Sequence, residues 1–142
     1  MGFNEIPYDY QPKTTYQVAQ ILEAKYGILQ TFYNMNEQKI IDSLVESYEN
    51  AISDIGFGAD PMALDPAGAA SSWIQHEFKE SLSRQAYDGV IRGVPTQASL
   101  TGRSRRFKKG YKTGTRASFI DSGLYQSSFQ VWVDNVSSPV SE

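Results

Sequence analysis

The chain contains no cysteine, only one histidine, His76, and no long apolar run. Without cysteine it has no disulfide, no thiolate nucleophile and no cysteine ligand for a metal. A Ser-His-Asp triad would depend on His76 alone, and a zinc site would need partners that the chain does not have. Since no window approaches a membrane span and residues 1–13 do not resemble a signal peptide, we expect neither. These absences predict a protein that is not an enzyme, with no catalytic residue, cofactor or metal.

Acidic residues are absent between Arg92 and Ile120, where eight lysines and arginines occur. Residues 1–91 carry 13 acids and five bases, and residues 121–142 carry three acids and no base. Such a separation of charge is typical of a chain that binds a partner or a copy of itself. The pI of about 5.2 weighs against a dedicated nucleic-acid binder, which is usually basic over a whole face.

Apolar residues at helical spacing predict a first helix after Thr14 or Thr15, and the pattern leaves open whether Gly27 ends it. A turn is expected at residues 34–36, followed by a second amphipathic helix that Gly56 ends. This helix should bury one apolar stripe. The stripe consists of Ile40, Ile41, Leu44, Val45, Tyr48, Ile52 and Ile55.

Residues 56–70 are rich in glycine, alanine and proline and predict a loop. Ser72 and Gln75 then match a capping box that should begin a third helix, which Gly93 should end. At the C-terminal end, Phe129, Val131 and Val133 alternate with polar residues and Trp132, which predicts a strand. The three alternating residues should face the helices, with Gln130 and Trp132 outward. Its pairing partner should be the basic connection or residues 1–13, and failing both, a neighbouring subunit.

Together these elements predict a mainly α fold with a small β-sheet (α+β), in which amphipathic helices precede a C-terminal turn, short helix and strand. We expect residues 1–13 to form an extended N-terminal arm and residues 14–134 a single domain. A long basic connection, residues 94–118, should project from that domain as a loop. Residues 135–142 should form a flexible tail.

The basic loop is the strongest candidate for binding a partner. Three interpretations remain open: a solvated loop, a nucleic-acid contact in which aromatic side chains stack on bases, and an arm that orders on an acidic protein surface. Trp132 is a further candidate, as an exposed aromatic on the strand. The candidate basic residues are Arg103, Arg105, Arg106, Lys108, Lys109, Lys112 and Arg116.

A family resemblance is carried by SFIDSGLYQSSFQVWV at residues 118–133, preceded by VPTQASLTGRSRRFK at residues 94–108. This region resembles a segment of small neck and tail-completion proteins of tailed bacteriophages, in which a Thr-Gly-x-Leu-x-x-Ser motif follows a helix. Here Ser122 stands in place of the threonine. The residues that carry the motif are Phe119, Asp121, Ser122, Gly123, Leu124, Ser128 and Phe129.

The resemblance implies a non-enzymatic structural subunit of a virion, placed in the neck, the head-tail connection or a tail completion ring. Its expected partners are copies of itself in a ring oligomer and other neck or tail proteins, with no membrane. Its expected location is the virion, assembled in the host cytoplasm. The alternative is a nucleic-acid-contacting protein whose basic residues between 103 and 116 touch the packaged DNA.

Overall fold

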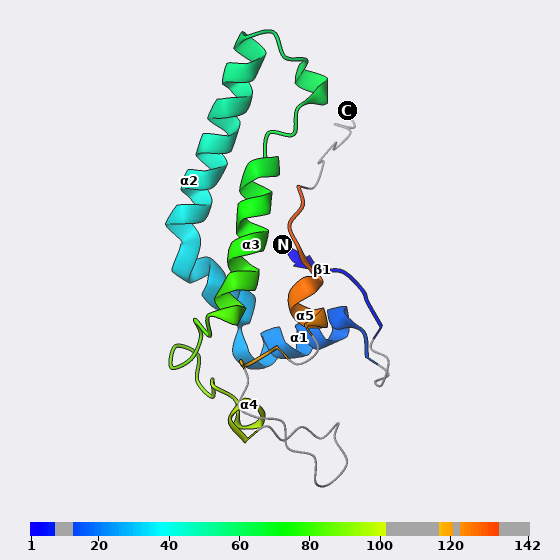
Figure 1. Cartoon of the computed structure of the whole chain (residues 1–142), viewed down its shortest axis with the longest axis vertical. Coiled ribbons are helices and arrows are strands. Elements are labelled where there is room, and N and C mark those ends of the chain that lie inside the picture. Colours follow the sequence, from blue (N-terminus) through cyan, green and yellow to red (C-terminus); the bar gives the residue numbers. More distant parts are fainter. Residues whose placement is uncertain (8–12, 102–116, 121–122, 134–142) are drawn as a thin grey trace, which may run out of the picture.

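A computed structural model describes residues 1–7, 13–101, 117–120 and 123–133. These residues form a mainly helical fold with a small antiparallel sheet, as the sequence predicts, and Figure 1 shows their arrangement. In chain order the elements are β1 (Gly2–Phe3), α1 (Thr15–Tyr26), α2 (Ile28–Gly56), the 3-10 turn η1 (Pro61–Ala63), α3 (Gly68–Ser83), α4 (Gln97–Thr101), α5 (Leu124–Ser127) and β2 (Phe129–Gln130).

Helices α1 and α2 meet at Gly27. Thr14 and Gln17 form a capping box at the start of α1, and Gly27, with a left-handed φ of 61°, ends it. Helix α2 then runs from Ile28 to Gly56 without a break, so the predicted turn at residues 34–36 was wrong. Asn36 is buried inside the helix, where its side-chain nitrogen donates a hydrogen bond to the Phe32 carbonyl at 2.9 Å.

Helix α3 lies beside α2 as the second arm of a hairpin (Figure 1). It begins at Gly68, one turn before the predicted capping box, and ends at Ser83, well before Gly93. Both predicted bounds were therefore wrong. The chain leaves the helix through Gln85, which has a φ of 57°, and folds back so that Tyr87 enters the core. The buried Tyr87 hydroxyl lies 2.7 Å from the Ser81 hydroxyl.

The predicted strand finds its partner inside the same chain. β2 pairs antiparallel with β1, with Phe3 opposite Phe129 and Gly2 opposite Gln130. The N-terminal residues therefore provide the missing strand, and no pairing across a subunit boundary is needed. Phe129 is buried and Val131 packs against the core, whereas Val133 is 57% exposed, so its predicted inward position was wrong.

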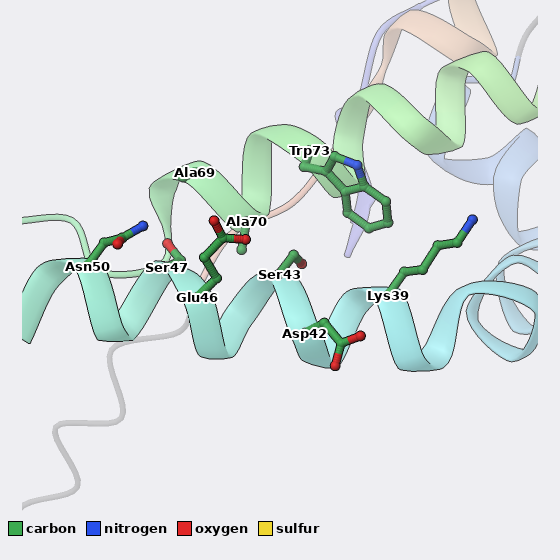
Figure 2. A pocket seen from close by; sticks show the side chains of 9 residues that line it. All are labelled: Lys39, Asp42, Ser43, Glu46, Ser47, Asn50, Ala69, Ala70 and Trp73. Carbon is green, nitrogen blue, oxygen red and sulfur yellow. The ribbon is translucent and has the colours of Figure 1, made fainter.

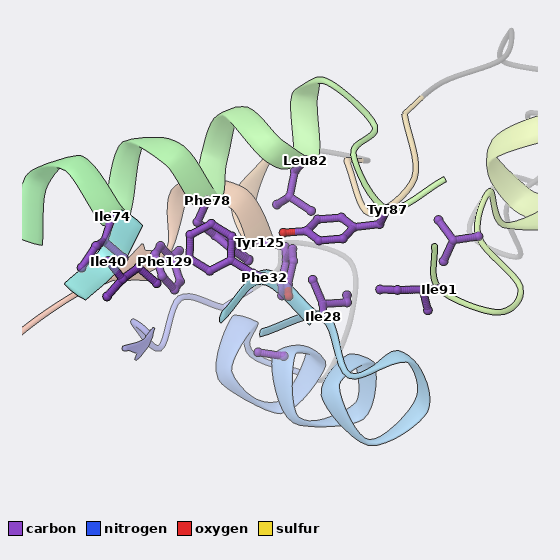
Figure 3. Packing of buried hydrophobic residues seen from close by; sticks show 12 residues of the cluster. Ile28, Phe32, Ile40, Ile74, Phe78, Leu82, Tyr87, Ile91, Tyr125 and Phe129 are labelled. Carbon is purple, nitrogen blue, oxygen red and sulfur yellow. The ribbon is translucent and has the colours of Figure 1, made fainter. Parts of the chain in front are cut away.

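The core lies where α3, the start of α2, α5 and the two strands meet, as Figure 3 shows. Phe78 lies at its centre, with ring centroids 5.3 Å from Phe32 and 4.1 Å from Phe129. Phe3 stacks on Tyr125 at 4.6 Å, which fixes the N-terminal strand onto α5. The core is thus concentrated at one end of the α2–α3 hairpin.

The other end of the hairpin has little core. Ile40 is buried and Leu44 is half-buried, but beyond them α2 faces α3 through the small residues Ser47 and Ala51. Tyr48, Ile52 and Ile55 were predicted to be buried with Ile40, and that prediction was wrong. They belong to an adjoining stripe that the described part of the chain leaves exposed. Exposed members of the predicted stripe are Ile41, Val45, Tyr48, Ile52 and Ile55.

Candidate interaction surfaces

The motif residues that the structure describes form a structural corner. Gly123, with a φ of 77°, precedes α5 in a left-handed conformation that only glycine adopts at little cost. Ser128 is fully buried, donates its hydroxyl to the Tyr125 carbonyl at 2.9 Å and accepts the Asn4 N–H on its own carbonyl at 2.8 Å. Asp121 and Ser122 of the motif lie outside the described residues. The motif therefore joins α5 to the N-terminal strand.

Side chains on either side of the corner attach it to the helices. The Phe119 ring packs edge-on against Tyr26 at the end of α1, with centroids 5.2 Å apart. On α5, the Gln126 amide donates to the Lys79 carbonyl at 2.5 Å and to the Ser83 hydroxyl at 2.8 Å. Leu124 lies in the same short helix and is half-buried. These contacts give the motif a packing role at the end of α3.

Trp132 lies just after β2 and is 52% exposed. A side chain on Gly2 would clash with its ring, so the tryptophan covers the backbone of the opposite strand. It also borders an open groove of about 770 Å³ between this strand and the start of α3. Tyr48 of α2 lines the same groove, which places the predicted Trp132 site near the exposed stripe.

The seven predicted basic residues between Arg103 and Arg116 all lie outside the described residues. The structure does describe both ends of the segment that carries them. Ser118 accepts the Thr96 N–H at 3.1 Å, and its hydroxyl lies 3.0 Å from that of Ser99 in α4. The segment therefore starts and ends close together, next to the junction of α1 and α2. Part of the predicted loop is helical, since α4 occupies Gln97–Thr101.

A second groove, which the sequence pattern did not reveal, lies between α2 and α3 (Figure 2). It has a volume of about 400 Å³, and its walls include Asp42 and Glu46 of α2 and Trp73 of α3. Trp73 is half-buried, so part of its ring faces this groove. Lys39 of α2 lines the same groove, so its walls combine acidic, basic and aromatic side chains. The sequence alone shows that Asp42 and Glu46 lie on one side of α2. That Trp73 lies across from this side can be known only from the packing of α3 against α2.

Groups for catalysis or metal binding are sparse in the part of the chain that the structure describes. His76 is exposed on α3, and no cluster of three histidine or acidic residues there could hold a metal ion. Arg84 forms an ion pair with Glu77 at 2.6 Å, and this hydrogen bond raises the pKa of Arg84. No helix among the described residues is long and apolar enough to cross a membrane.

No family model matches the chain, and comparison with curated proteins and with solved structures gives no match.

Proposed function

We propose that this chain is a non-enzymatic structural subunit of a bacteriophage virion, part of the neck, the head-tail connection or a tail completion ring. The observation that carries the proposal is the exposed apolar stripe of α2, from Ile41 to Ile55, on a molecule whose charges are segregated along its sequence. A monomeric protein rarely exposes such a continuous apolar surface. The resemblance of residues 118–133 to neck and tail-completion proteins supplies the virion context.

The described surfaces favour assembly over chemistry. Both grooves are open, and their linings combine polar side chains with a tryptophan ring. The motif corner holds β1 and α5 against α3, so the fold has a rigid base from which the hairpin extends (Figure 1). A subunit of this shape can join neighbours through the hairpin while its base keeps its own core.

The alternative function is contact with packaged DNA through residues 103–116. This segment contains seven lysines and arginines and no acidic residue. The test is a variant in which Arg103, Arg105 and Arg106 are all alanine, supplied in place of the wild-type subunit during particle assembly. We expect it to fold normally and to enter particles poorly.

Normal entry into particles would contradict the structural role of these arginines. If DNA retention alone fell, and the salt dependence of nucleic-acid affinity weakened by about one per lost phosphate contact, the DNA-contacting function would replace it.

A further inference from the structure

The exposed stripe of α2 has the spacing of a helix-packing surface. Ile41, Val45, Tyr48, Ile52 and Ile55 are separated by four, three, four and three residues. This alternation of four and three residues places the side chains along one face of the helix. It is the spacing that is typical of a helix face packed against another helix. The five side chains are between 42% and 67% exposed. The face of α2 that meets α3 lies one residue earlier in the sequence, at Ile40, Ser47 and Ala51, so α3 does not cover the stripe.

Apolar surface continues beyond the stripe onto the tip of the hairpin. Phe57 is 91% exposed and Met62 is 92% exposed. The hairpin tip lies far from the motif corner in Figure 1. The whole distal half of the hairpin therefore presents large apolar side chains to solvent, which is typical of a surface that another chain covers.

Acidic residues border this surface. Asp42 and Glu49 each follow a member of the stripe, and residues 40–75 contain six acids and no lysine or arginine. Packing the stripe against the same stripe of another copy would bring together two helices of like charge. A favourable occupant must combine apolar side chains with positive charge.

One segment of this chain has that composition. Residues 102–116 contain seven lysines and arginines and no acid, with Phe107 and Tyr111 among them. Its charge of +7 opposes the −6 of residues 40–75.

The distal end of the stripe, at Ile52 and Ile55, is out of reach of the segment in its own copy. Both ends of the segment are held near Tyr26, through Phe119 and through the bonds between Ser118 and α4. A chain of this length, attached at both ends, extends at most about 27 Å from its base. The helix rises on the order of 36 Å from Ile28 to Ile52. Figure 1 places α4 and the hairpin tip at opposite ends of the molecule.

We propose that residues 102–116 of one copy bind the α2 stripe of a second copy, with their basic side chains against Asp42 and Glu49 and their aromatic side chains on the distal end of the stripe, at Ile52 and Ile55. The inference rests on the proposed function, because it identifies the contact through which the subunits join. The contact is head-to-tail, since each copy offers a segment at one end and a stripe at the other. Such contacts build a ring when the rotation between copies closes.

The absence of cysteine makes a disulfide cross-link a clean test of this contact. Two full-length variants, Ile52→Cys and Phe107→Cys, are mixed under mild oxidation, and the cross-linked dimers are identified by mass spectrometry. The control replaces Ile52→Cys by Gln30→Cys, an exposed position at the other end of α2. We expect the mixed dimer to form at least about tenfold more with Ile52→Cys than with the control, because binding raises the effective concentration of the two thiols.

Equal cross-linking at the two positions would overturn the proposal. So would a sample in which Ile52→Cys pairs mainly with itself, because that result would place two α2 stripes together.

A charge exchange distinguishes this inference from the proposed function. One variant carries Asp42→Lys and Glu49→Lys, and the other carries Arg105→Glu and Arg106→Glu; circular dichroism checks that each folds. We expect each alone to lose the oligomer in light scattering and their mixture to regain it, because each altered surface then meets its opposite charge.

If both variants assemble alone as the wild type does, the contact lies elsewhere and the structural role stands without this inference. If the wild type stays monomeric at every concentration, both the contact and the self-assembling subunit are refuted.

Discussion

At the scale of single residues, stability depends on a small group of aromatic side chains. Phe78 is fully buried and has aromatic neighbours from three other parts of the chain: Phe32 on α2, Phe3 on the N-terminal strand, and Tyr125 and Phe129 near the C-terminal end. Ile52 has a similar apolar character but lies on the exposed stripe. The two residues therefore separate packing within the subunit from contact between subunits.

Phe78→Ala should lower the free energy of unfolding by about 3–5 kcal/mol, because the cavity lies among rings that cannot all move inward. Ile52→Ala should change it by less than about 0.5 kcal/mol, as at an ordinary surface position. Urea denaturation of both variants, at a concentration where the protein is monomeric, gives the two values. A large loss for Ile52→Ala would show that the stripe is buried within the monomer.

Tyr87 gives the fold a dependence on alkaline pH. Burial raises the pKa of its hydroxyl to about 12, from an ordinary value of 10, although the hydrogen bond to Ser81 acts in the opposite direction. The folded state holds this proton more tightly than the unfolded state, so the stabilisation is complete below pH 10 and is lost as the pH rises toward 12.

Between these pH values the free energy of unfolding of the wild type should fall by up to about 2 kcal/mol more than that of Tyr87→Phe. Denaturation curves across this range, for both proteins, provide the measurement. Parallel pH profiles would mean that Tyr87 ionises as easily in the folded state as in the unfolded state.

At the scale of elements, local signals predicted the helices well and their ends unevenly. Thr14 caps α1 as expected, because the capping box is contained within four residues. The turn at residues 34–36 was predicted from asparagines, which favour turns, but Asn36 hydrogen-bonds within the helix. The early end of α3 depends on burial of Tyr87, a tertiary contact that helical spacing does not report.

The candidate surfaces also divide into those that local sequence predicts and those that depend on tertiary packing. The basic run and the motif could be recognised from residue types alone, and the strand from its alternation. The exposed stripe could not, because Ile41, Val45 and Ile52 have the same apolar character as buried Ile40. Only the position of α3, which meets α2 through Ser47 and Ala51, determines which stripe is covered. The groove beside Trp73 depends on the same packing.

Gly27, which precedes α2, and Gly56, its last residue, should respond differently to replacement by alanine. Gly27 has a left-handed φ of 61°, so Gly27→Ala should destabilise the fold by about 1 kcal/mol even though no atom blocks the new methyl group. Gly56 has no positive φ and equally open surroundings, so Gly56→Ala should be neutral or stabilise by up to about 1 kcal/mol. Thermal unfolding of both variants tests this. Equal effects would show that Gly27 does not separate α1 from α2 by its conformation.

At the scale of the whole molecule, charge and apolar surface are divided between two ends. The motif corner and the core form a stable base, from which the described end of α4 leads into the basic segment. The hairpin carries the acids and the exposed stripe away from that base, as Figure 1 shows. A subunit with complementary ends can assemble in one direction, which suits a ring at the neck or tail of a virion.

Such an assembly should depend on both charge and apolar contact. Raising the salt from about 0.05 M to about 0.5 M shortens the screening length from roughly 14 Å to roughly 4 Å and should weaken the oligomer without unfolding the subunit. Sedimentation velocity at the two salt concentrations, with circular dichroism as a check on folding, provides the measurement. An oligomer that strengthens with salt would show that apolar contact alone holds the copies together.

Self-assembly through the α2 stripe is tested by the molar mass of the full-length protein in light scattering at low salt, for wild type and Ile52→Glu. The wild type should have a mass that is a multiple of 15.9 kDa, and Ile52→Glu should remain folded at 15.9 kDa. A glutamate at this position adds a charge to an exposed site of the monomer but would be buried in the contact. A wild-type protein that stays at 15.9 kDa at every concentration, or an Ile52→Glu variant that assembles fully, would contradict the account.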